Sequence, residues 1–122
     1  MNKILIVDDE KDVCETLERF LKRKQFDVII AYNGQEAIEK VKQEKPQIVL
    51  LDIRMPGMDG IRCLKEIRKI DGKVGIIMIT AVEDDETGKK CIEYGAYDYI
   101  TKPLGLEYLE NVLAVKLFDM QG

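Results

Sequence analysis

The chain has 122 residues, 46% of them hydrophobic and 34% charged, and carries a formal net charge of −4. This length suits a single domain, residues 1–122, that buries about two thirds of its unfolded surface without disulfides. The acidic balance disfavours direct nucleic-acid contact, no apolar run approaches the ~20 residues of a membrane span, and the basic start is too short for a signal peptide. We therefore expect a cytoplasmic protein without membrane contact.

Short apolar runs alternate with amphipathic stretches along the whole chain. Each run is long enough for one strand and too short for a buried helix, and three of them are rich in Ile and Val. The stretches between them carry apolar residues at helical spacing, such as Val13, Leu17 and Leu21. In chain order we expect a strand over residues 3–7, a helix around 13–21, a strand over 27–31, a helix around 37–41, a strand over 48–51, a helix around 61–67, a strand over 76–79, a helix over 84–94, a strand over 97–100 and a helix around 106–117.

This succession of strand–helix units predicts an α/β fold. Crossovers between parallel strands are right-handed almost without exception, so helices must cover both faces of the sheet. The runs at 3–7, 48–51 and 76–79 are apolar on consecutive residues, as central strands are, whereas 27–31 and 97–100 include polar residues, as edge strands can. We therefore expect a doubly wound, five-stranded parallel sheet of flavodoxin-like order 2-1-3-4-5, an order that rests partly on analogy.

Polar side chains follow four of the apolar runs. Asp8 and Asp9 come after the first run, Asp52 after the third, Thr80 after the fourth and Lys102 shortly after the fifth. In open α/β sheets the carboxyl ends of the strands meet at the edge where ligands bind. Carboxylate oxygens suit Mg²⁺, while an ammonium and a hydroxyl suit phosphoryl oxygens. Asp52 is the natural nucleophile, because carboxylates form aspartyl-phosphate intermediates. Taken singly, these residues also fit helix caps or turns; together they predict a phosphoryl-transfer site.

The motifs ILIVDDE, LLDIRMPGMDG, MITA and DYITKP resemble, in order and spacing, the signatures of bacterial two-component response-regulator receiver domains of the chemotaxis and sporulation-phosphorelay kind. The resemblance covers residues 1–118. It implies that Asp52 accepts a phosphoryl group, with Mg²⁺, from a sensor histidine kinase, a phosphotransfer protein or a small phosphodonor. It also implies a signalling domain rather than an enzyme, because receivers catalyse only their own phosphorylation and dephosphorylation.

The resemblance further implies a set of metal ligands. Asp9 and Asp52 would contact Mg²⁺ directly, together with the backbone carbonyl of Arg54, and Asp8 would act mainly through water. Pro56 belongs to the turn that shapes the loop around the acceptor.

The same resemblance implies a switch. Lys102 would bind the phosphoryl group, Thr80 would be the switch hydroxyl, and Tyr99 resembles the aromatic rotamer switch, although an edge-strand tyrosine packed on a helix is an equally good interpretation. In receivers, phosphorylation biases a two-state equilibrium across the fourth helix, fifth strand and fifth helix, a surface that serves output and could serve a homodimer. Gly88 inside the fourth helix and Gly105 at the usual N-cap of the fifth depart from the pattern, and both weaken helices. We expect this face to be the least stable part of the free domain.

Other site classes fit less well. A haloacid-dehalogenase-like phosphatase expects DxDx(T/V) where this chain has Asp8-Asp9-Glu10, and a flavodoxin-type binding module expects a Ser/Thr-Gly phosphate loop that is missing. The chain contains no histidine, which excludes Ser-His-Asp and Cys-His catalysis and histidine-ligated zinc. It also lacks the GxxxxGK(S/T) loop of P-loop enzymes.

Two further expectations concern context. Cys14, Cys63 and Cys91 are odd in number and lack metal-ligand spacing, so we expect them to be reduced and mostly buried. The stretch GAYDYITKPLGLEYLENVL resembles receivers of enhancer-binding transcription regulators. Two interpretations stay open: a stand-alone receiver, or the N-terminal receiver of a longer transcription regulator.

Overall fold

The computed structural model describes residues 2–55 and 57–121, so Pro56 and the expectation for it lie outside the described residues. Strands and helices alternate along the chain, as the periodicity predicts. Their bounds are β1 (Lys3–Val7), α1 (Lys11–Arg23), β2 (Asp27–Ala31), α2 (Gly34–Glu44), β3 (Ile48–Leu51), α3 (Gly60–Ile70), β4 (Gly75–Thr80), α4 (Asp85–Glu93), β5 (Asp98–Thr101) and α5 (Leu106–Gln121).

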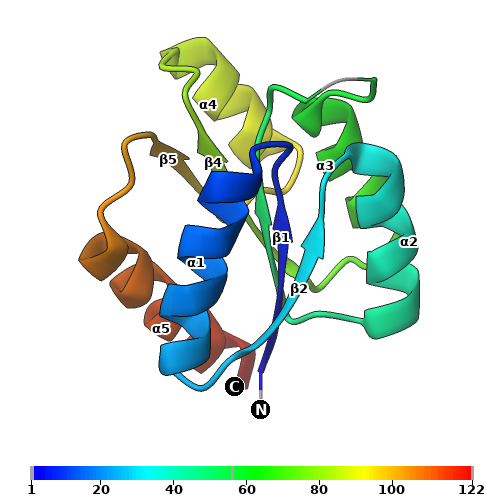
Figure 1. Cartoon of the computed structure of the whole chain (residues 1–122). Helices are drawn as coiled ribbons and strands as arrows, with labels where there is room; N and C mark the ends of the chain where they lie inside the picture. The colour runs from blue at the N-terminus through cyan, green and yellow to red at the C-terminus, as the bar shows by residue number, and fades with distance from the viewer. Residues whose placement is uncertain (1, 56, 122) are drawn as a thin grey trace.

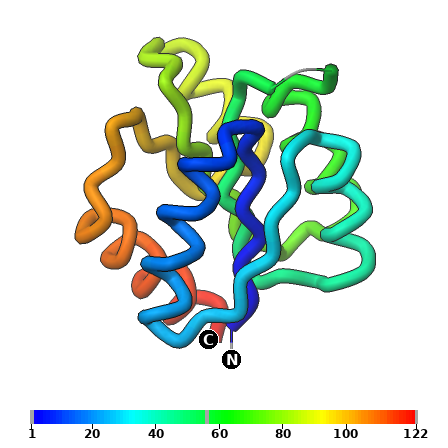
Figure 2. Tube along the Cα trace, in the orientation of Figure 1, coloured from blue at the N-terminus to red at the C-terminus, as the bar shows by residue number. Residues whose placement is uncertain are grey.

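All paired strands run parallel, in the order β2-β1-β3-β4-β5. Helices α1 and α5 cover one face of the sheet, and α2, α3 and α4 cover the other (Figure 1). The loops that follow β1, β3 and β4 lie at the same edge, the upper one in Figure 2. The predicted doubly wound sheet, its strand order and its two helical layers are confirmed.

Burial follows the place of each strand in the sheet. Every residue of β3 and β4 is buried, because helices pack on both faces of these central strands. The edge strands β2 and β5 are only partly buried, as their polar residues predict. Cys14, Cys63 and Cys91 are free thiols buried in the two cores, also as predicted. In the part of the chain that the structure describes, no helix has the length and apolar character needed to cross a membrane.

Three elements differ from their predicted bounds. β4 extends one residue at each end, so Thr80 is its last residue, and β5 begins and ends one residue later than expected. The fourth helix is shorter than the predicted 84–94, because Asp84 is its N-cap and Tyr94 its C-cap. The Asp84 carboxylate accepts hydrogen bonds from the Glu86 N–H (3.3 Å) and the Thr87 hydroxyl (2.7 Å), which holds Asp84 itself outside the helix.

Candidate functional site

Two buried carboxylates and one ammonium meet at the carboxyl edge of the sheet. Asp8 follows β1, Asp52 follows β3 and Lys102 follows β5. The Lys102 Nζ lies 2.9 Å from Asp8 Oδ2 and 3.4 Å from Asp52 Oδ2. The side chains of Asp8 and Asp52 are only 5% and 6% exposed, and that of Lys102 is 17% exposed. These three residues are separated by 44 to 94 positions in the chain, and the order of the parallel strands brings them together.

The neighbouring strands fix the backbone of all three residues. The N–H of Asp8 donates to the last carbonyl of β2 (3.2 Å), and the N–H of Asp52 donates to the last carbonyl of β1 (3.0 Å). In the same way the N–H of Lys102 donates to the carbonyl of Thr80 at the end of β4 (2.8 Å). Each of these three residues therefore adds one hydrogen bond to the end of the sheet. This bond fixes the backbone of the residue, and its side chain stays at the carboxyl edge of the sheet.

Burial and charge act in opposite directions on the ionisable groups. Burial raises the pKa of Asp8, an effect that the Glu10 N–H and the Lys102 ammonium only partly offset and that the charge of Asp52 reinforces. Burial by itself would lower the pKa of Lys102, but the hydrogen bond to Asp8 and the charge of Asp52 outweigh it, so the pKa of Lys102 is raised. Both pKa values are thus raised, but by different causes: burial dominates at Asp8, whereas the carboxylates around Lys102 outweigh the effect of its burial.

A third carboxylate, from Glu10, belongs to this group. The ligand oxygens of Asp8, Glu10 and Asp52 all lie within 4.8 Å of one another. Asp9, for which the resemblance to receiver domains implies direct metal contact, is exposed, and among the described residues this set of three does not include it. The sequence analysis missed Glu10, although its position directly before α1, where Ser, Thr, Asp or Asn is usual, was a signal. Hard carboxylate oxygens so close together fit Mg²⁺.

The loop after β3 contacts Asp52 through its backbone. Arg54 is exposed, and its N–H lies 3.4 Å from Asp52 Oδ1. Gly60 donates its N–H to the carbonyl of Ile53 (2.7 Å), and a Cβ at this position would collide with the backbone of Asp52 and Ile53. Asp59 caps α3 by accepting a hydrogen bond from the Arg62 N–H (2.9 Å). Only glycine therefore allows α3 to begin this close to Asp52.

Thr80 and Tyr99 lie on the neighbouring strands. Thr80 is fully buried (0% exposed), and its Oγ1 accepts a hydrogen bond from the Val82 N–H at 3.2 Å. The Tyr99 hydroxyl donates to the carbonyl of Val82. The Tyr99 ring also packs along α4, where a Cβ on Gly88 would lie 3.5 Å from it. Both residues of the predicted switch thus bond the same residue of the β4–α4 loop, one to its N–H and one to its carbonyl.

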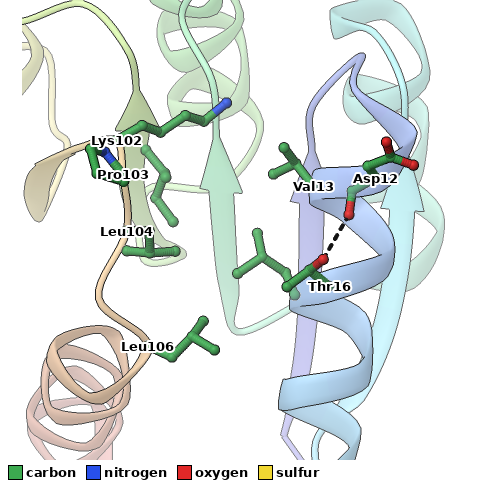
Figure 3. A pocket seen from close by; sticks show the side chains of 9 residues that line it. Asp12, Val13, Thr16, Lys102, Pro103, Leu104 and Leu106 are labelled. Atoms are coloured by element: carbon green, nitrogen blue, oxygen red, sulfur yellow. Dashed lines mark hydrogen bonds between the residues drawn. The ribbon is translucent and has the colours of Figure 1, made fainter.

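An apolar groove of about 370 Å³ runs beside the acidic group (Figure 3). One wall comes from α1, through Val13, Thr16 and Leu17, and the other from the segment between β5 and α5. Lys102 lines this groove and also reaches the carboxylates, so the two features share a residue.

Comparison with known proteins identifies the family and the fold. A family model described as the response regulator receiver domain matches residues 4–114. A two-component response regulator from Clostridium difficile is 34% identical, with 100% of both chains covered and a TM-score of 0.96. CheY in a CheX–CheY–BeF3–Mg complex from Borrelia burgdorferi is 37% identical, with 93% of this chain and 88% of that one covered and a TM-score of 0.88. The BeF3-activated N-terminal receiver domain of Klebsiella pneumoniae RstA is 33% identical, with 95% and 98% covered and a TM-score of 0.90.

Proposed function

The chain belongs to the response regulator receiver domain family, and from this premise we propose that Asp52 accepts a phosphoryl group in the presence of Mg²⁺. One observation carries the proposal: the Lys102 ammonium lies within 3.4 Å of the Asp52 carboxylate and 2.9 Å of the Asp8 carboxylate, at the carboxyl edge of the sheet. A carboxylate nucleophile beside a fixed cation is the arrangement that phosphoryl transfer to Asp requires.

Each residue has a role in this reaction. The carboxylates of Asp8, Asp9 and Asp52, with the backbone carbonyl of Arg54, would hold Mg²⁺, which neutralises charge on the transferring phosphoryl group. Asp52 attacks the phosphorus through one carboxylate oxygen as the bond to the donor breaks. Lys102 turns from the carboxylates to a phosphoryl oxygen. In the unmodified site the neighbouring carboxylates raise its pKa, so Lys102 meets the phosphoryl group as an ammonium.

We propose that a sensor histidine kinase or a phosphotransfer protein donates the phosphoryl group. The groove between α1 and the β5–α5 segment supports a helical donor, because the apolar side chains of Val13, Leu104 and Leu106 line the same groove as Lys102 (Figure 3). A small phosphodonor reaches the same carboxylate from solvent. The buried free cysteines support a reducing cytoplasmic location.

Output would follow from the α4–β5–α5 face. Phosphorylation draws the Thr80 hydroxyl toward a phosphoryl oxygen, which breaks its bond to the Val82 N–H and disturbs the carbonyl that Tyr99 holds. The exposed side chains of Ile92 and Tyr108 (48% and 54%) lie on α4 and α5, where an output domain, a downstream protein or a second copy would read the change. A transcription-regulator context and a stand-alone role both fit this surface.

The test is modification of the intact chain by acetyl phosphate with Mg²⁺, followed by mass spectrometry. We expect one phosphoryl group on the wild type and none on Asp52→Asn. Asp27→Asn is the matched control, because Asp27 is an exposed acid at the far end of β2, and it should be modified as fast as wild type. Equal labelling of Asp52→Asn, or labelling that persists in EDTA, would refute the proposal.

A further inference from the structure

A hollow of about 420 Å³ lies at the amino edge of the sheet, the lower edge in Figure 2 and the edge opposite the carboxylate group. Its walls come from α3, from α5 and from the loops that lead into β4 and β5. The lining consists of three basic residues, three glycines, two buried apolar residues and one tyrosine, namely Arg68, Lys73 and Lys116, Gly72, Gly75 and Gly95, Val74 and Ala96, and Tyr97. Its volume falls in the range of small-molecule sites, about 300–1,000 Å³.

Three cationic side chains from separate elements line this hollow. Arg68 belongs to α3, Lys73 to the α3–β4 loop and Lys116 to α5. In the part of the chain that the structure describes, none of the three lies in a salt bridge, and no carboxylate lines the hollow. The chain as a whole carries a net charge of −4, so this is a local excess of positive charge, which attracts anions.

Nearby acids compensate this charge only in part. The charge of Asp71 acts on Arg68, while its Oδ1 accepts two backbone N–H groups of the following loop (2.8 and 3.1 Å). The carboxylate of Asp98 accepts hydrogen bonds from the Tyr99 N–H (2.7 Å) and the Tyr108 hydroxyl (3.4 Å). With Asp71 counted, three cations against one carboxylate still leave two net positive charges.

Neutral groups hold Arg68 in place. Its Nη1 donates to the carbonyls of Asp71 (3.2 Å) and Val74 (2.8 Å), and its Nη2 donates to the carbonyl of Gly95 (2.5 Å). Carbonyl oxygens satisfy N–H donors but do not cancel the charge of the guanidinium. The loops that lead into β4 and β5 therefore fix a positive charge whose geometry is set before any ligand arrives.

Lys116 is held by apolar contacts. Its aliphatic stem lies so close to Gly75 that a Cβ there would come within 3.0 Å of it. Its Nζ lies over the Tyr97 ring, 4.7 Å from the centroid. A cation–π contact is weaker than a charge-assisted hydrogen bond, so the ammonium can turn from the ring to an anion while its stem stays on Gly75.

We propose that this hollow binds a small phosphate-class anion, either inorganic phosphate or the phosphate group of a small ester. Three cations from separate elements suit the several oxygens of one compact dianion better than a single carboxylate. Gly72 leaves the rim open, because a Cβ there would meet nothing within 4 Å. The bound anion joins α3, α5 and the loop that leads into β4, and so stabilises the folded chain. The inference is independent of the proposed function, because the hollow lies at the opposite edge of the sheet from Asp52.

The experiment titrates the intact chain with inorganic phosphate and, separately, with glycerol phosphate, in EDTA and at constant ionic strength set with chloride. Backbone amide chemical shifts of residues 72–75 and 95–97 report binding in the hollow. Lys73→Gln removes one charge, and Lys116→Met removes another while keeping the apolar stem on Gly75. Lys42→Gln is the matched control, because Lys42 is an exposed cation in the last turn of α2 that does not line the hollow. Thermal melts verify that each variant folds.

We expect saturable shifts at these amides in the wild type. The phosphate Kd should rise about twofold to fivefold in Lys73→Gln and in Lys116→Met, about tenfold in the double variant, and by less than about 1.5-fold in Lys42→Gln. Tighter binding of glycerol phosphate assigns the hollow to an organic phosphate, and equal binding assigns it to the phosphate group alone. Shifts that do not saturate, or an equal loss of affinity in Lys42→Gln, overturn the inference and leave the proposed function untouched.

Discussion

Replacing Gly88 with alanine should stabilise α4 and with it the whole domain. Gly88 lies inside α4 (Asp85–Glu93), where its N–H donates to the Asp84 carbonyl at 3.0 Å in ordinary helical geometry. The nearest atoms that a Cβ here would meet belong to the Tyr99 ring, at 3.5, 3.6 and 3.8 Å, which is ordinary van der Waals contact. Alanine is therefore accommodated without strain, and it adds an apolar contact between α4 and β5.

The magnitude follows from two contributions. Alanine is favoured over glycine in a helix interior by about 0.8–1.0 kcal/mol. A methyl group that packs on Tyr99 adds a fraction of the ~0.8 kcal/mol of a fully buried methylene, because position 88 is only half-buried. The sum is about 1–1.5 kcal/mol, and for a domain of this size it should raise the Tm by roughly 3–7 °C.

Urea denaturation and amide hydrogen exchange would measure this effect. The unfolding free energy of Gly88→Ala should rise, and exchange over residues 85–93 should slow more than over 61–70. Gly72→Ala is the control, since a Cβ at Gly72 meets nothing within 4 Å, and it should change stability by less than about 0.5 kcal/mol. An unchanged or lower stability of Gly88→Ala, or slower exchange elsewhere but not in α4, would refute the view that glycine loosens this helix.

Three other substitutions test separate features. Gly60→Ala should destabilise the domain by about 2 kcal/mol or more, because its Cβ collides with backbone at Asp52, and it should slow modification of Asp52 by acetyl phosphate; wild-type stability would contradict this. Asp8→Asn should stabilise the metal-free chain at pH 7 by about 0.5–2 kcal/mol, because burial raises the folded pKa of Asp8 and its ionised form costs stability. The destabilisation by ionised Asp8 appears as the pH rises through its folded pKa. Urea titrations should therefore show that the extra stability of Asp8→Asn vanishes below about pH 4. Extra stability that persists below that pH would contradict this explanation. Arg68→Lys should cost about 1–3 kcal/mol in urea unfolding, because the guanidinium bonds three backbone carbonyls, among them that of Gly95 at 2.5 Å, and exchange should quicken around residue 95; unchanged exchange there would contradict this anchoring role.

The sequence by itself determined the architecture. Short apolar runs and period-3.6 patterns indicated the order of strands and helices, and the rule that crossovers are right-handed then left few sheet topologies. Consecutive apolar residues at 48–51 and 76–79 distinguished central strands, and the polar residues at 27–31 and 97–100 distinguished edges. Asp8, Asp52 and Lys102 could be predicted to meet because each directly follows a strand, and parallel strands end at one edge. These properties are local or topological, so they can be read without coordinates.

Only the tertiary structure decided what surrounds these residues. Glu10 lies close to Asp8 and Asp52 because the direction of a side chain at the start of α1 depends on cap geometry and on the distant Lys102 ammonium. The raised pKa of Asp8 depends on burial by elements from the whole chain, which no local pattern encodes. The bond between Tyr99 and the Val82 carbonyl likewise joins residues 17 positions apart through the packing of α4 on β5. Long-range contacts of this kind are set by the relative placement of packed elements, and that placement is a property of the folded chain as a whole.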